Sequence, residues 1–444
     1  MKPYPKYKDS GVEWIGEVPE GWEVKKIKHS TYVKGRVGWH GLNSNDFINE
    51  GPFLVTGTDF SNGRIDWNTC YHVSVEHYDK DPFIQLKEND LLITKDGSIG
   101  KVAIVQSLEG QATLNSGIFV TRPLKNQYLT AYLYWVLNSS VFVNFIDYNK
   151  TGSTVLHLYQ DTFENFSFPL PLIQEQKAIC YYLDRKTAQI DNLISTKQKL
   201  IELLKEERAA IINQAVTKGL NPDAPMKDSG IEWLGEIPAH WEVKRMKYVA
   251  RITLGKMLTN VDKGGYHYRP YLRAQNINWE KVNVEDVKKM WFSKDELRQY
   301  RLNKNDLLVS EGGEVGRTSI WNEEIEECYI QNSVHKVTME PTNDPFFFLY
   351  TFCLYGEKGV FESVVSRISI AHLTKEKLKE IPFPMPPTDE QRRISKFIRS
   401  ETTKIDQTIS NIAKQIDLLQ EFRTALISEV VTGKIDVRDE GLNG

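Results

Sequence analysis

The chain has 444 residues, of which 40% are hydrophobic, 11% aromatic and 26% charged. This length and apolar content suffice for two or more folded domains and exclude an intrinsically disordered protein. The net charge of -3 and the pI near 6.4 argue against nucleic-acid binding by the chain as a whole, because duplex affinity comes largely from cations that replace condensed counterions.

The sequence contains no segment that predicts membrane insertion or secretion. No run approaches the roughly 18 uncharged apolar residues of a membrane helix, and the start, MKPYPKYKDSGVEW, lacks the apolar core of a signal peptide. The cysteines form no CxxC pair, so neither a zinc ribbon nor a redox couple is indicated; they are Cys70, Cys180, Cys328 and Cys353. We therefore expect a cytoplasmic protein with reduced thiols and no metal or cofactor of its own.

The first recognisable feature along the chain is a motif around Trp14 that returns in the second half. Residues 9–19 read DSGVEWIGEVP, and residues 228–238 read DSGIEWLGEIP. The sequence WEVK then occurs at 22–25 and again at 241–244. Agreement of this length does not arise by chance, so we predict a tandem duplication.

Further matching segments follow in the same order in both halves. They pair residues 86–93 with 302–309, Gly97–Lys101 with Gly313–Arg317, Asn115–Ser116 with Asn332–Ser333, 169–171 with 384–386, and 175–176 with 390–391. A period of about 216 residues is too long for a solenoid repeat. Each copy is therefore predicted to be a domain with an appendage.

The domain of each copy, at 1–170 and 227–385, is rich in aromatic and β-branched residues. Short apolar runs at 90–94, 101–105 and 117–121 alternate with Gly, Asn and Asp turns, and residues 128–137 form a helical stretch. This pattern predicts a mixed α/β domain with a curved sheet. Four tryptophans that recur in both copies are expected to pack the start of each domain against its helix: Trp14, Trp22, Trp233 and Trp241.

The appendage of each copy, at 171–217 and 386–432, is predicted to be a long helix. From 175 to 217 and from 390 to 432 there is neither proline nor glycine, and apolar residues recur with the four-three spacing of a heptad seam. The seam residues are Leu183, Ile190, Ile194, Ile201, Leu204 and Ile211, and then Ile398, Ile405, Ile409, Ile412, Ile416, Leu419 and Leu426.

Each helix would reach about 65 Å at 1.5 Å per residue. A seam of this kind also occurs in helix-bundle cores, but two matched helices favour pairing with each other as an antiparallel coiled coil. A linker at 218–226 joins the first helix to the second domain, and a tail at 433–444 ends the chain. The predicted fold is thus α+β: two mixed α/β domains and two long helices with pseudo-twofold symmetry.

This organisation resembles the specificity subunit of Type I DNA restriction-modification systems over essentially the whole chain. The resemblance rests on DSGVEWIG at 9–16 and GIEWLG at 230–235, and on PLPLIQEQ at 169–176 and PMPPTDEQ at 384–391. It also rests on the element with Asp90, Gly97 and Gly100, its counterpart with Asp306, Gly313 and Gly316, and the tails AVTKG at 215–219 and VVTGK at 430–434.

The resemblance implies two target recognition domains separated by spacer helices, each domain recognising one half of a bipartite DNA site. It implies partners as well: double-stranded DNA, two modification subunits that use S-adenosylmethionine to methylate adenine, and restriction subunits that use ATP and Mg²⁺. The chain itself is then expected to be non-catalytic.

No catalytic motif is evident in the chain. The glycine segments at 97–101 and 312–318 are too short for a Walker A loop and are typical of hairpin turns with glycines at positive φ. There is no Asn-Pro-Pro-Tyr/Phe methylation motif, no HExxH metal motif and no strand followed by a glycine-rich cofactor loop. We therefore predict no catalytic residue and no metal ligand.

Candidate DNA-contacting residues lie in turn-rich segments that contain Arg, Lys, Asn, Gln or His, the residue types that bind base edges and phosphates. They are Lys34, Arg36, Trp39, His40, Lys101, Lys150, Ser153, His157, Arg273, Gln275, Asn276 and Arg317. Residues 273–276 are favoured because their counterpart, aligned at 55–58, has wholly different side chains between similar flanks. Solvated loops remain the alternative for each residue.

Two other functions stay open at this stage. One is a coiled-coil adaptor that binds protein partners, which the acidic balance favours, and the other is a self-sufficient nuclease. Steep weakening of duplex binding by salt would distinguish DNA recognition from the adaptor. The helix pair is further predicted to act as a ruler that sets the gap between the two half-sites.

Overall fold

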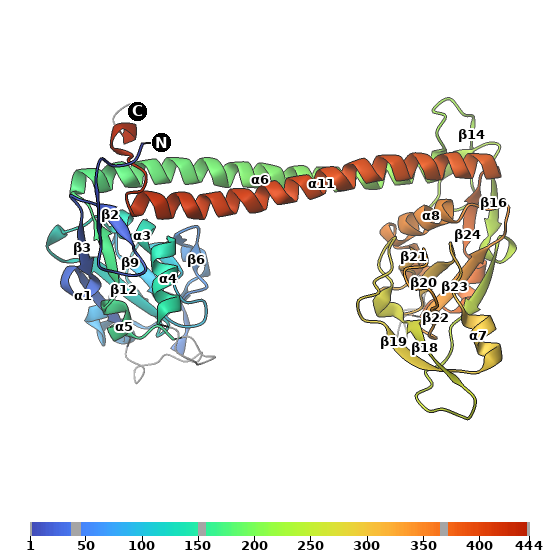
Figure 1. Cartoon of the computed structure of the whole chain (residues 1–444), viewed down its shortest axis with the longest axis horizontal. Helices are drawn as coiled ribbons and strands as arrows, with labels where there is room; N and C mark the ends of the chain where they lie inside the picture. The colour runs from blue at the N-terminus through green and yellow to red at the C-terminus, as the bar shows by residue number, and fades with distance from the viewer. Residues whose placement is uncertain (1, 37–45, 150–156, 365–371, 442–444) are drawn as a thin grey trace. The chain divides into compact units, whose positions relative to one another are not determined.

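The computed structural model describes residues 2–36, 46–149, 157–364 and 372–441 (Figure 1). The chain divides into two compact units, which we call unit 1 (residues 1–197 with 413–444) and unit 2 (residues 198–412). Each unit contains one globular part and a portion of each of two long helices, α6 (Ile173–Lys218) and α11 (Thr388–Val431).

The two long helices confirm the heptad prediction. α6 has 46 residues and α11 has 44; Gly219, with φ of 73°, directly follows α6, and Gly433, with φ of 74°, lies two residues after the end of α11. Glycine is favoured there because the residue after a helix commonly takes a left-handed conformation. The proline-rich segments before each helix mark where it begins, since proline lacks the N–H that a helix interior needs.

Within each unit the two helices pack side by side. In unit 1 the partners Asp191–Arg423 (2.9 Å) and Lys197–Gln415 (2.6 Å) run in opposite order along the two helices, so the pairing is antiparallel. In unit 2, Arg208 on α6 pairs with Asp406 on α11 at 3.0 Å. Every predicted seam residue is buried or half-buried.

The globular part of unit 1 contains a six-stranded sheet and a three-stranded sheet. The larger has the order β4 (Thr31–Gly35), β12 (Ile118–Pro123), β9 (Leu91–Thr94), β10 (Val102–Ile104), β7 (Arg64–Ile65) and β6 (Phe60–Ser61). The smaller has the order β11 (Ala112–Leu114), β5 (Ile48–Val55) and β8 (Tyr71–His72). Two short ladders join β1 (Tyr7–Asp9) to β2 (Glu17–Pro19), and β3 (Glu23–Lys26) to β13 (Ser167–Leu170).

Short helices complete unit 1: α1 (Ile27–Ser30), α2 (Val75–Asp79), α3 (Thr130–Leu137), α4 (Ser140–Tyr148) and α5 (Gln160–Glu164). α3 and α4 connect the sheet to the long helices. Trp135 on α3 donates to Asp184 on α6 at 3.0 Å, and the backbone N–H of Ser140 donates to Ser428 on α11 at 2.9 Å.

Unit 2 repeats this plan. Its larger sheet has the order β17 (Ala250–Leu254), β23 (Val334–Met339), β20 (Leu307–Ser310) and β21 (Thr318–Ile320). Its smaller sheet has the order β19 (Lys288–Phe292), β18 (His267–Leu272) and β22 (Tyr329–Ile330). Short ladders join β14 (Met226–Asp228) to β15 (Glu236–Pro238), and β16 (Glu242–Arg245) to β24 (Pro382–Met385).

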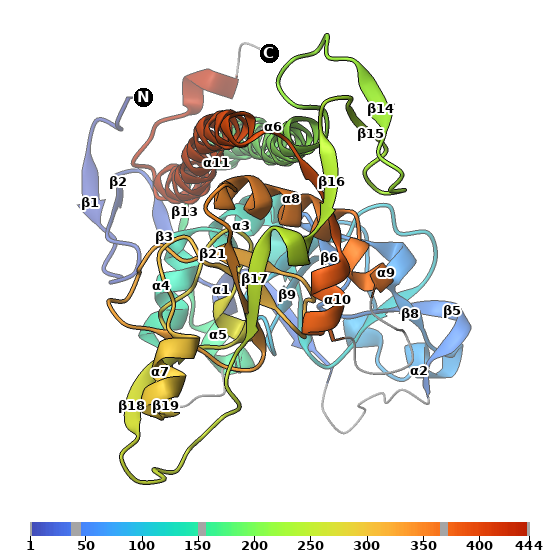
Figure 2. The same cartoon turned by 90° about the vertical axis from the view of Figure 1, so that its right-hand side faces the viewer.

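The short helices of unit 2 are α7 (Lys294–Tyr300), α8 (Pro345–Glu357), α9 (Val360–Val364) and α10 (Lys375–Glu380). α8 lies between the sheet and the long helices (Figures 1 and 2). Its apolar residues share one core with Ile212 and Val216 of α6 and with Ile394 and Ile398 of α11. The long helices are therefore part of the core of the unit.

The recurring tryptophans have two different roles. Trp22 and Trp241 are 1% and 0% exposed, and each contacts the glycine that follows the long helix of the other copy, Gly433 and Gly219 respectively. Trp22 also donates to Glu175, on the helix of its own copy, at 3.4 Å, as predicted. Trp14 packs on Phe145 of α4, and Trp233 on Tyr355 of α8. The prediction is thus corrected for this second pair, which packs on the short helices.

The two ends of the chain pair with each other in unit 1. At the corresponding place, unit 2 has a continuous linker. The backbones of Lys2 and Asp436 form a bridge, and the Tyr7 hydroxyl donates to the carbonyl of Gly433 at 2.9 Å. The Arg438 guanidinium lies 4.7 Å from the centre of the Tyr4 ring. In unit 2 the covalent segment 219–225 connects the end of α6 to β14 at the corresponding place.

Candidate nucleic-acid interface

Three turns come together at one end of the sheets in each unit, and we call this group the turn cluster. It comprises residues 56–59, 94–101 and 115–117 in unit 1, and residues 273–276, 310–317 and 331–333 in unit 2. In unit 2, Arg317 donates to the carbonyl of Ala274 (2.8 Å), whose N–H donates to the Ser333 hydroxyl (3.0 Å). Three segments distant in sequence thus form one surface.

The first turn has the same backbone in both units. The Asp59 carboxylate accepts from the N–H of Thr56 at 2.7 Å, and the Asn276 side chain accepts from the N–H of Arg273 at 3.1 Å. The strands before the turns agree, because Leu114 pairs with Val55 and Ile330 pairs with Leu272. Residues 273–276 therefore correspond to 56–59, and the alignment with 55–58 was off by one residue.

The same pairing also corrects the neighbouring segment. The N–H of Asn115 donates to Val55, and the N–H of Gln331 donates to Leu272, each at 2.9 Å. Asn115–Ser116 therefore corresponds to Gln331–Asn332, one residue before the predicted match. Similar residue types at adjacent positions misled the comparison, because sequence identity alone does not record which backbone group is hydrogen-bonded.

The corrected register separates residues that hold the turn from residues that face solvent. Asp59 and Asn276 are 2% and 3% exposed, and both cap the turn. Thr58 and Gln275 are equivalent and both exposed. The two copies thus share a buried cap and differ at an exposed tip.

The glycine turns between β9 and β10 and between β20 and β21 are hairpins, as predicted. Gly97 and Gly100 have φ of 67° and 85°, and Gly313 and Gly316 have φ of 76° and 79°. A Cβ on Gly100 would lie 3.1 Å from Phe142, and one on Gly316 would lie 2.3 Å from Phe361. These glycines allow the turn to sit directly on α4 and α9.

The basic residues of these turns differ in exposure. Lys101 is exposed. Arg317 has 21% side-chain exposure and pairs with Glu314 at 3.0 Å, besides its bond to Ala274. A hairpin of this kind positions its cation next to the first turn, where a phosphate or base edge could be contacted.

The other predicted residues of unit 1 lie in different environments. Lys34 is exposed on β4, and His157 pairs with Asp96 of the glycine turn. Arg36 is 3% exposed and donates to Leu114 and Thr113, and burial lowers the pKa of its guanidinium. Four predicted residues lie outside the described residues: Trp39, His40, Lys150 and Ser153.

In unit 2, Arg273 and Gln275 lie at the turn cluster, with Arg273 paired to Asp286. Asn276 is buried and its amide donates to Asn283 at 2.9 Å and Asp286 at 3.1 Å. Asn276 and Arg36 are buried and hydrogen-bonded within the protein, so the prediction that they contact DNA is corrected for these two. DNA contact stays a prediction for the others.

A histidine next to the glycine turn was missed in the second copy. His372 Nδ1 lies near Gly312, and the N–H of Leu373 donates to Glu311 at 2.8 Å, as the N–H of Leu158 does to Lys95 at 2.9 Å. His372 therefore corresponds to His157. The spacing of these two histidines matches the repeat period, and this signal was available in the sequence.

The acidic, histidine and cysteine side chains of the described residues form no metal-binding group. No group of three or more His, Cys, Asp or Glu among them could hold a metal ion. Burial raises the pKa of the Cys180 and Cys328 thiols to about 12, so these thiols stay protonated at neutral pH. Within the same residues, no helix is both long and apolar enough to cross a membrane.

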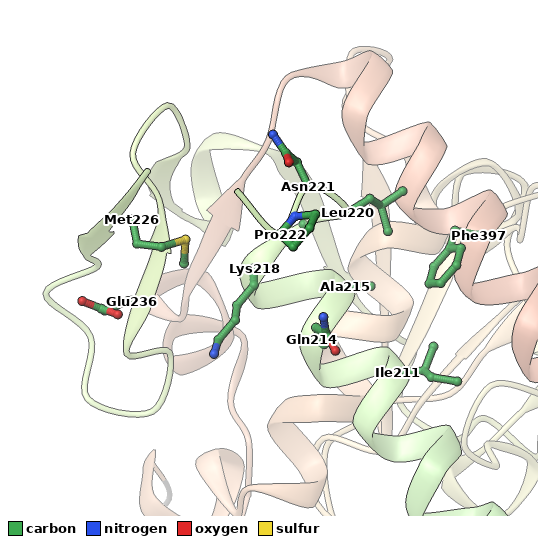
Figure 3. Close-up of a pocket in the computed structure, with 11 residues that line it drawn as sticks. Ile211, Gln214, Ala215, Lys218, Leu220, Asn221, Pro222, Met226, Glu236 and Phe397 are labelled. Atoms are coloured by element: carbon green, nitrogen blue, oxygen red, sulfur yellow. The ribbon is translucent and has the colours of Figure 1, made fainter. Parts of the chain in front are cut away.

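A pocket of about 750 Å³ lies in unit 2 where α6 ends (Figure 3). Ile211, Ala215, Leu220 and Phe397 are among the apolar residues that line it, and its polar lining residues are Gln214, Lys218, Asn221 and Glu236. Ligand sites usually combine an apolar lining with convergent polar groups. Here the polar groups are few and stand apart, so the pocket carries no evident chemistry.

The chain matches known proteins over most of its length. The family model for the type I restriction modification DNA specificity domain matches residues 19–205 and again 238–418. The putative type I restriction enzyme MjaX specificity subunit of Methanocaldococcus jannaschii is 26% identical over 434 residues, 96% of each chain. The EcoKI specificity subunit of Escherichia coli K12 is 23% identical over 300 residues, 66% of this chain and 62% of its own.

Two solved structures share the fold. One, from work on complex assembly and conformational transition of the type I R-M system, has a TM-score of 0.74 and 16% identity, covering 94% of this chain and 99% of its own. The other, the HsdS subunit from Thermoanaerobacter tengcongensis, has a TM-score of 0.55 and 15% identity, covering 94% and 98%.

Proposed function

The chain belongs to the type I restriction modification DNA specificity family, and we propose that each of its units recognises one half of a bipartite DNA site for partner enzymes. The observation that carries this proposal is the turn cluster, in which a common backbone presents different side chains. Thr56 and Thr58 in unit 1 stand where Arg273 and Gln275 stand in unit 2. Arg and Gln make bidentate contacts to guanine and adenine, whereas Thr is a weaker and less selective partner.

The chemistry of the complex is assigned to partner subunits. Two modification subunits would bring S-adenosylmethionine and methylate adenine, and restriction subunits would bring ATP-dependent cleavage with Mg²⁺. The specificity chain would contribute only recognition of the target sequence. This division is supported by the family and by the missing Asn-Pro-Pro-Tyr/Phe motif in the sequence.

The long helices are proposed to set the gap between the half-sites and to dock the modification subunits. Each helix is continuous from one unit into the other, so its residue count enters the spacing. Four residues inserted into each helix would add about 6 Å. The preferred gap should then grow by one or two base pairs, and an unchanged gap would refute the ruler.

The decisive experiment maps methylated adenines made by the chain together with its modification subunits. Methylation at a split sequence is expected, and binding should weaken steeply with salt. Gln275→Thr and Thr58→Gln exchange the exposed tips, and each should alter preference in one half-site only. Lys227→Ala, an exposed residue of β14, is the control. Salt-insensitive binding to protein alone would favour the adaptor function instead.

A further inference from the structure

The segment between β17 and β18, residues 257–266, exposes three large apolar side chains, and we call it the apolar loop. Met257, Leu258 and Val261 are 75%, 51% and 71% exposed. The loop projects from the end of unit 2 opposite α6 and α11 (Figures 1 and 2). Single exposed apolar residues are common, but three within five positions of one loop mark an interaction surface.

The loop is held at its base by backbone hydrogen bonds. The N–H of Lys256 donates to Ile330 at 3.0 Å, the N–H of Asn332 donates to Lys256 at 2.9 Å, and the N–H of Trp291 donates to Thr259 at 3.0 Å. Lys256 is 8% exposed, and its ammonium group donates to the Glu296 carboxylate at 2.5 Å. The apolar side chains therefore point outward from a fixed base.

A turn shapes the tip of the loop. The Asp262 carboxylate accepts from the N–H groups of Gly264 (2.9 Å) and Tyr266 (3.3 Å). Gly264 and Gly265 have φ of 89° and 74°, which only glycine adopts without strain. Asp262 is thus occupied within the loop, while Lys263 at the tip is exposed.

The neighbouring surface has the composition of a nucleic-acid contact. Tyr268 is 49% exposed and its ring centre lies 5.1 Å from that of Trp291, on adjacent strands. Lys288 and Lys289 are exposed on β19, the edge strand that also carries Trp291. Exposed acids nearby are Glu285, Asp286 and Asp295, of which Asp286 pairs with Arg273; Asp295 precedes Glu296, the partner of Lys256.

The loop also adjoins the turn cluster. Lys256 bonds to Ile330 and Asn332, so the loop leaves the sheet beside residues 331–333. β18 then connects the end of the loop to residues 273–276. The equivalent segment of unit 1 includes residues 37–45, which lie outside the described residues.

We propose that the apolar loop enters a groove of the duplex at the second half-site, where Met257, Leu258 and Val261 contact the bases. Apolar side chains recognise thymine methyl groups or wedge between base steps, and both uses require them to be exposed before DNA binds. Lys263, Lys288 and Lys289 would neutralise adjacent phosphates. This inference rests on the proposed function and deepens it, because it names the segment of unit 2 that reaches the bases.

The direct test places a photo-crosslinker on the loop. Val261 is replaced by p-benzoylphenylalanine in the chain assembled with its modification subunits, and the complex is irradiated on its mapped target duplex. A crosslink to bases in or beside the second half-site is expected. A crosslink to a modification subunit, or no crosslink to DNA, would overturn the proposal.

The second test removes the apolar surface and keeps the loop length, with Met257→Ser, Leu258→Ser and Val261→Ser combined. Because these side chains are exposed, folding should persist, as circular dichroism would check. Affinity for the target should fall about 10- to 100-fold, the effect of one or two mismatched base pairs, with little change on unrelated DNA. Val143→Ser, 54% exposed on α4 of unit 1, is the matched control and should leave the affinity unchanged.

The outcomes separate this inference from the proposed function. Unaltered target affinity in the triple variant would refute the role of the loop while site-specific binding by the wild-type complex still supported the function. No site-specific binding by the wild-type complex would refute the function itself. If the triple variant lost binding to phosphatidylglycerol vesicles relative to the wild type while its DNA affinity stayed unaltered, the loop would be assigned to a membrane surface and the inference would be overturned.

Discussion

A buried aspartate at the start of one strand shows how the two copies solve the same problem with different residues. Asp90 is 3% exposed and pairs with Arg122 at 2.6 Å. Asp306, its counterpart, is 2% exposed and accepts from the N–H of Asn303 (2.8 Å) and from the Thr338 hydroxyl (2.5 Å). Burial raises the pKa of Asp306, because the nearby hydrogen bonds and cations do not fully offset desolvation.

The raised pKa of Asp306 predicts a pH dependence of stability. The stabilising effect of the protonated carboxyl is present below the unfolded pKa of about 4 and is lost as pH rises through the higher folded pKa. Asp306→Asn cannot titrate, so the stability of wild type relative to this variant should fall as pH rises across that window and then level off.

The measurement is urea unfolding with hydrogen exchange of β20 peptides between pH 4 and 8. Asp295→Asn, whose side chain is 95% exposed on α7, serves as control and should show a smaller change with pH. A wild-type advantage that grows with pH would contradict the assignment.

The two glycines of one turn predict unequal costs of substitution. Gly316→Ala places a Cβ 2.3 Å from Phe361, which is 0% exposed and has no room to move. Gly313→Ala has a similar positive φ but meets no atom within 4 Å. We expect about 3 kcal/mol or more of destabilisation for the first and about 1 kcal/mol for the second, by denaturant midpoints. Equal losses would mean that the backbone conformation alone sets the cost.

At the scale of elements, the long helices owe their stability to the stripe of apolar residues that forms the heptad seam. Ile190 is 8% exposed at the seam in unit 1, whereas Leu193 on the same helix is 44% exposed. Helix propensity alone does not hold such a segment rigidly in water, so burial of the stripe against the partner helix supplies the main stabilisation.

This contrast yields a matched pair of variants. Ile190→Ala should lower the free energy of unfolding of unit 1 by about 2 to 3 kcal/mol, since a buried branched side chain leaves a cavity. Leu193→Ala should change it by about 0.5 kcal/mol or less, as is usual for exposed positions. Thermal melting with hydrogen exchange of α6 peptides measures both, and an equal effect would argue that the seam is not the main contact.

At the scale of the whole molecule, the ends of the chain complete unit 1. The tail covers α6 through the ion pair of Arg185 with Glu440 at 2.9 Å, and Val437 is 1% exposed. In unit 2 the linker 219–225 occupies the corresponding place as one covalent segment. An unbroken backbone is therefore needed neither at the chain ends in unit 1 nor at the linker in unit 2, provided that the segments on both sides of the break still pack.

A circularly permuted chain tests this view. Joining the two ends through a short flexible linker and opening the chain between Asp223 and Ala224 should preserve the fold, because each unit keeps its contacts. Its circular dichroism and target binding should match the wild type. Deletion of residues 434–444, in contrast, should destabilise unit 1 because it removes the buried Val437 and the Arg438 that lies over the Tyr4 ring.

The sequence by itself determined the features that recur. The duplication, the two helices and their seam, the glycine hairpins and the strands near Leu92 and Val120 followed from spacing, residue type and repetition, and the structure confirms them. Local conformational preferences and hydrophobic periodicity are properties of short segments, so a sequence expresses them directly.

Only the tertiary structure decided which polar residues are available to a partner. Arg36 and Asn276 look like base-contacting residues in the sequence, yet both are buried and hydrogen-bonded internally, Arg36 to residues of β11 and Asn276 to the carbonyls of Asn283 and Asp286. The register of residues 273–276 depended on the pairing of Leu272 with Ile330. The exposure of Met257 and Val261 is likewise a property of the folded chain. A side chain faces solvent or core according to what packs on it, and for Arg36 that packing comes from residues 77 and 78 positions away.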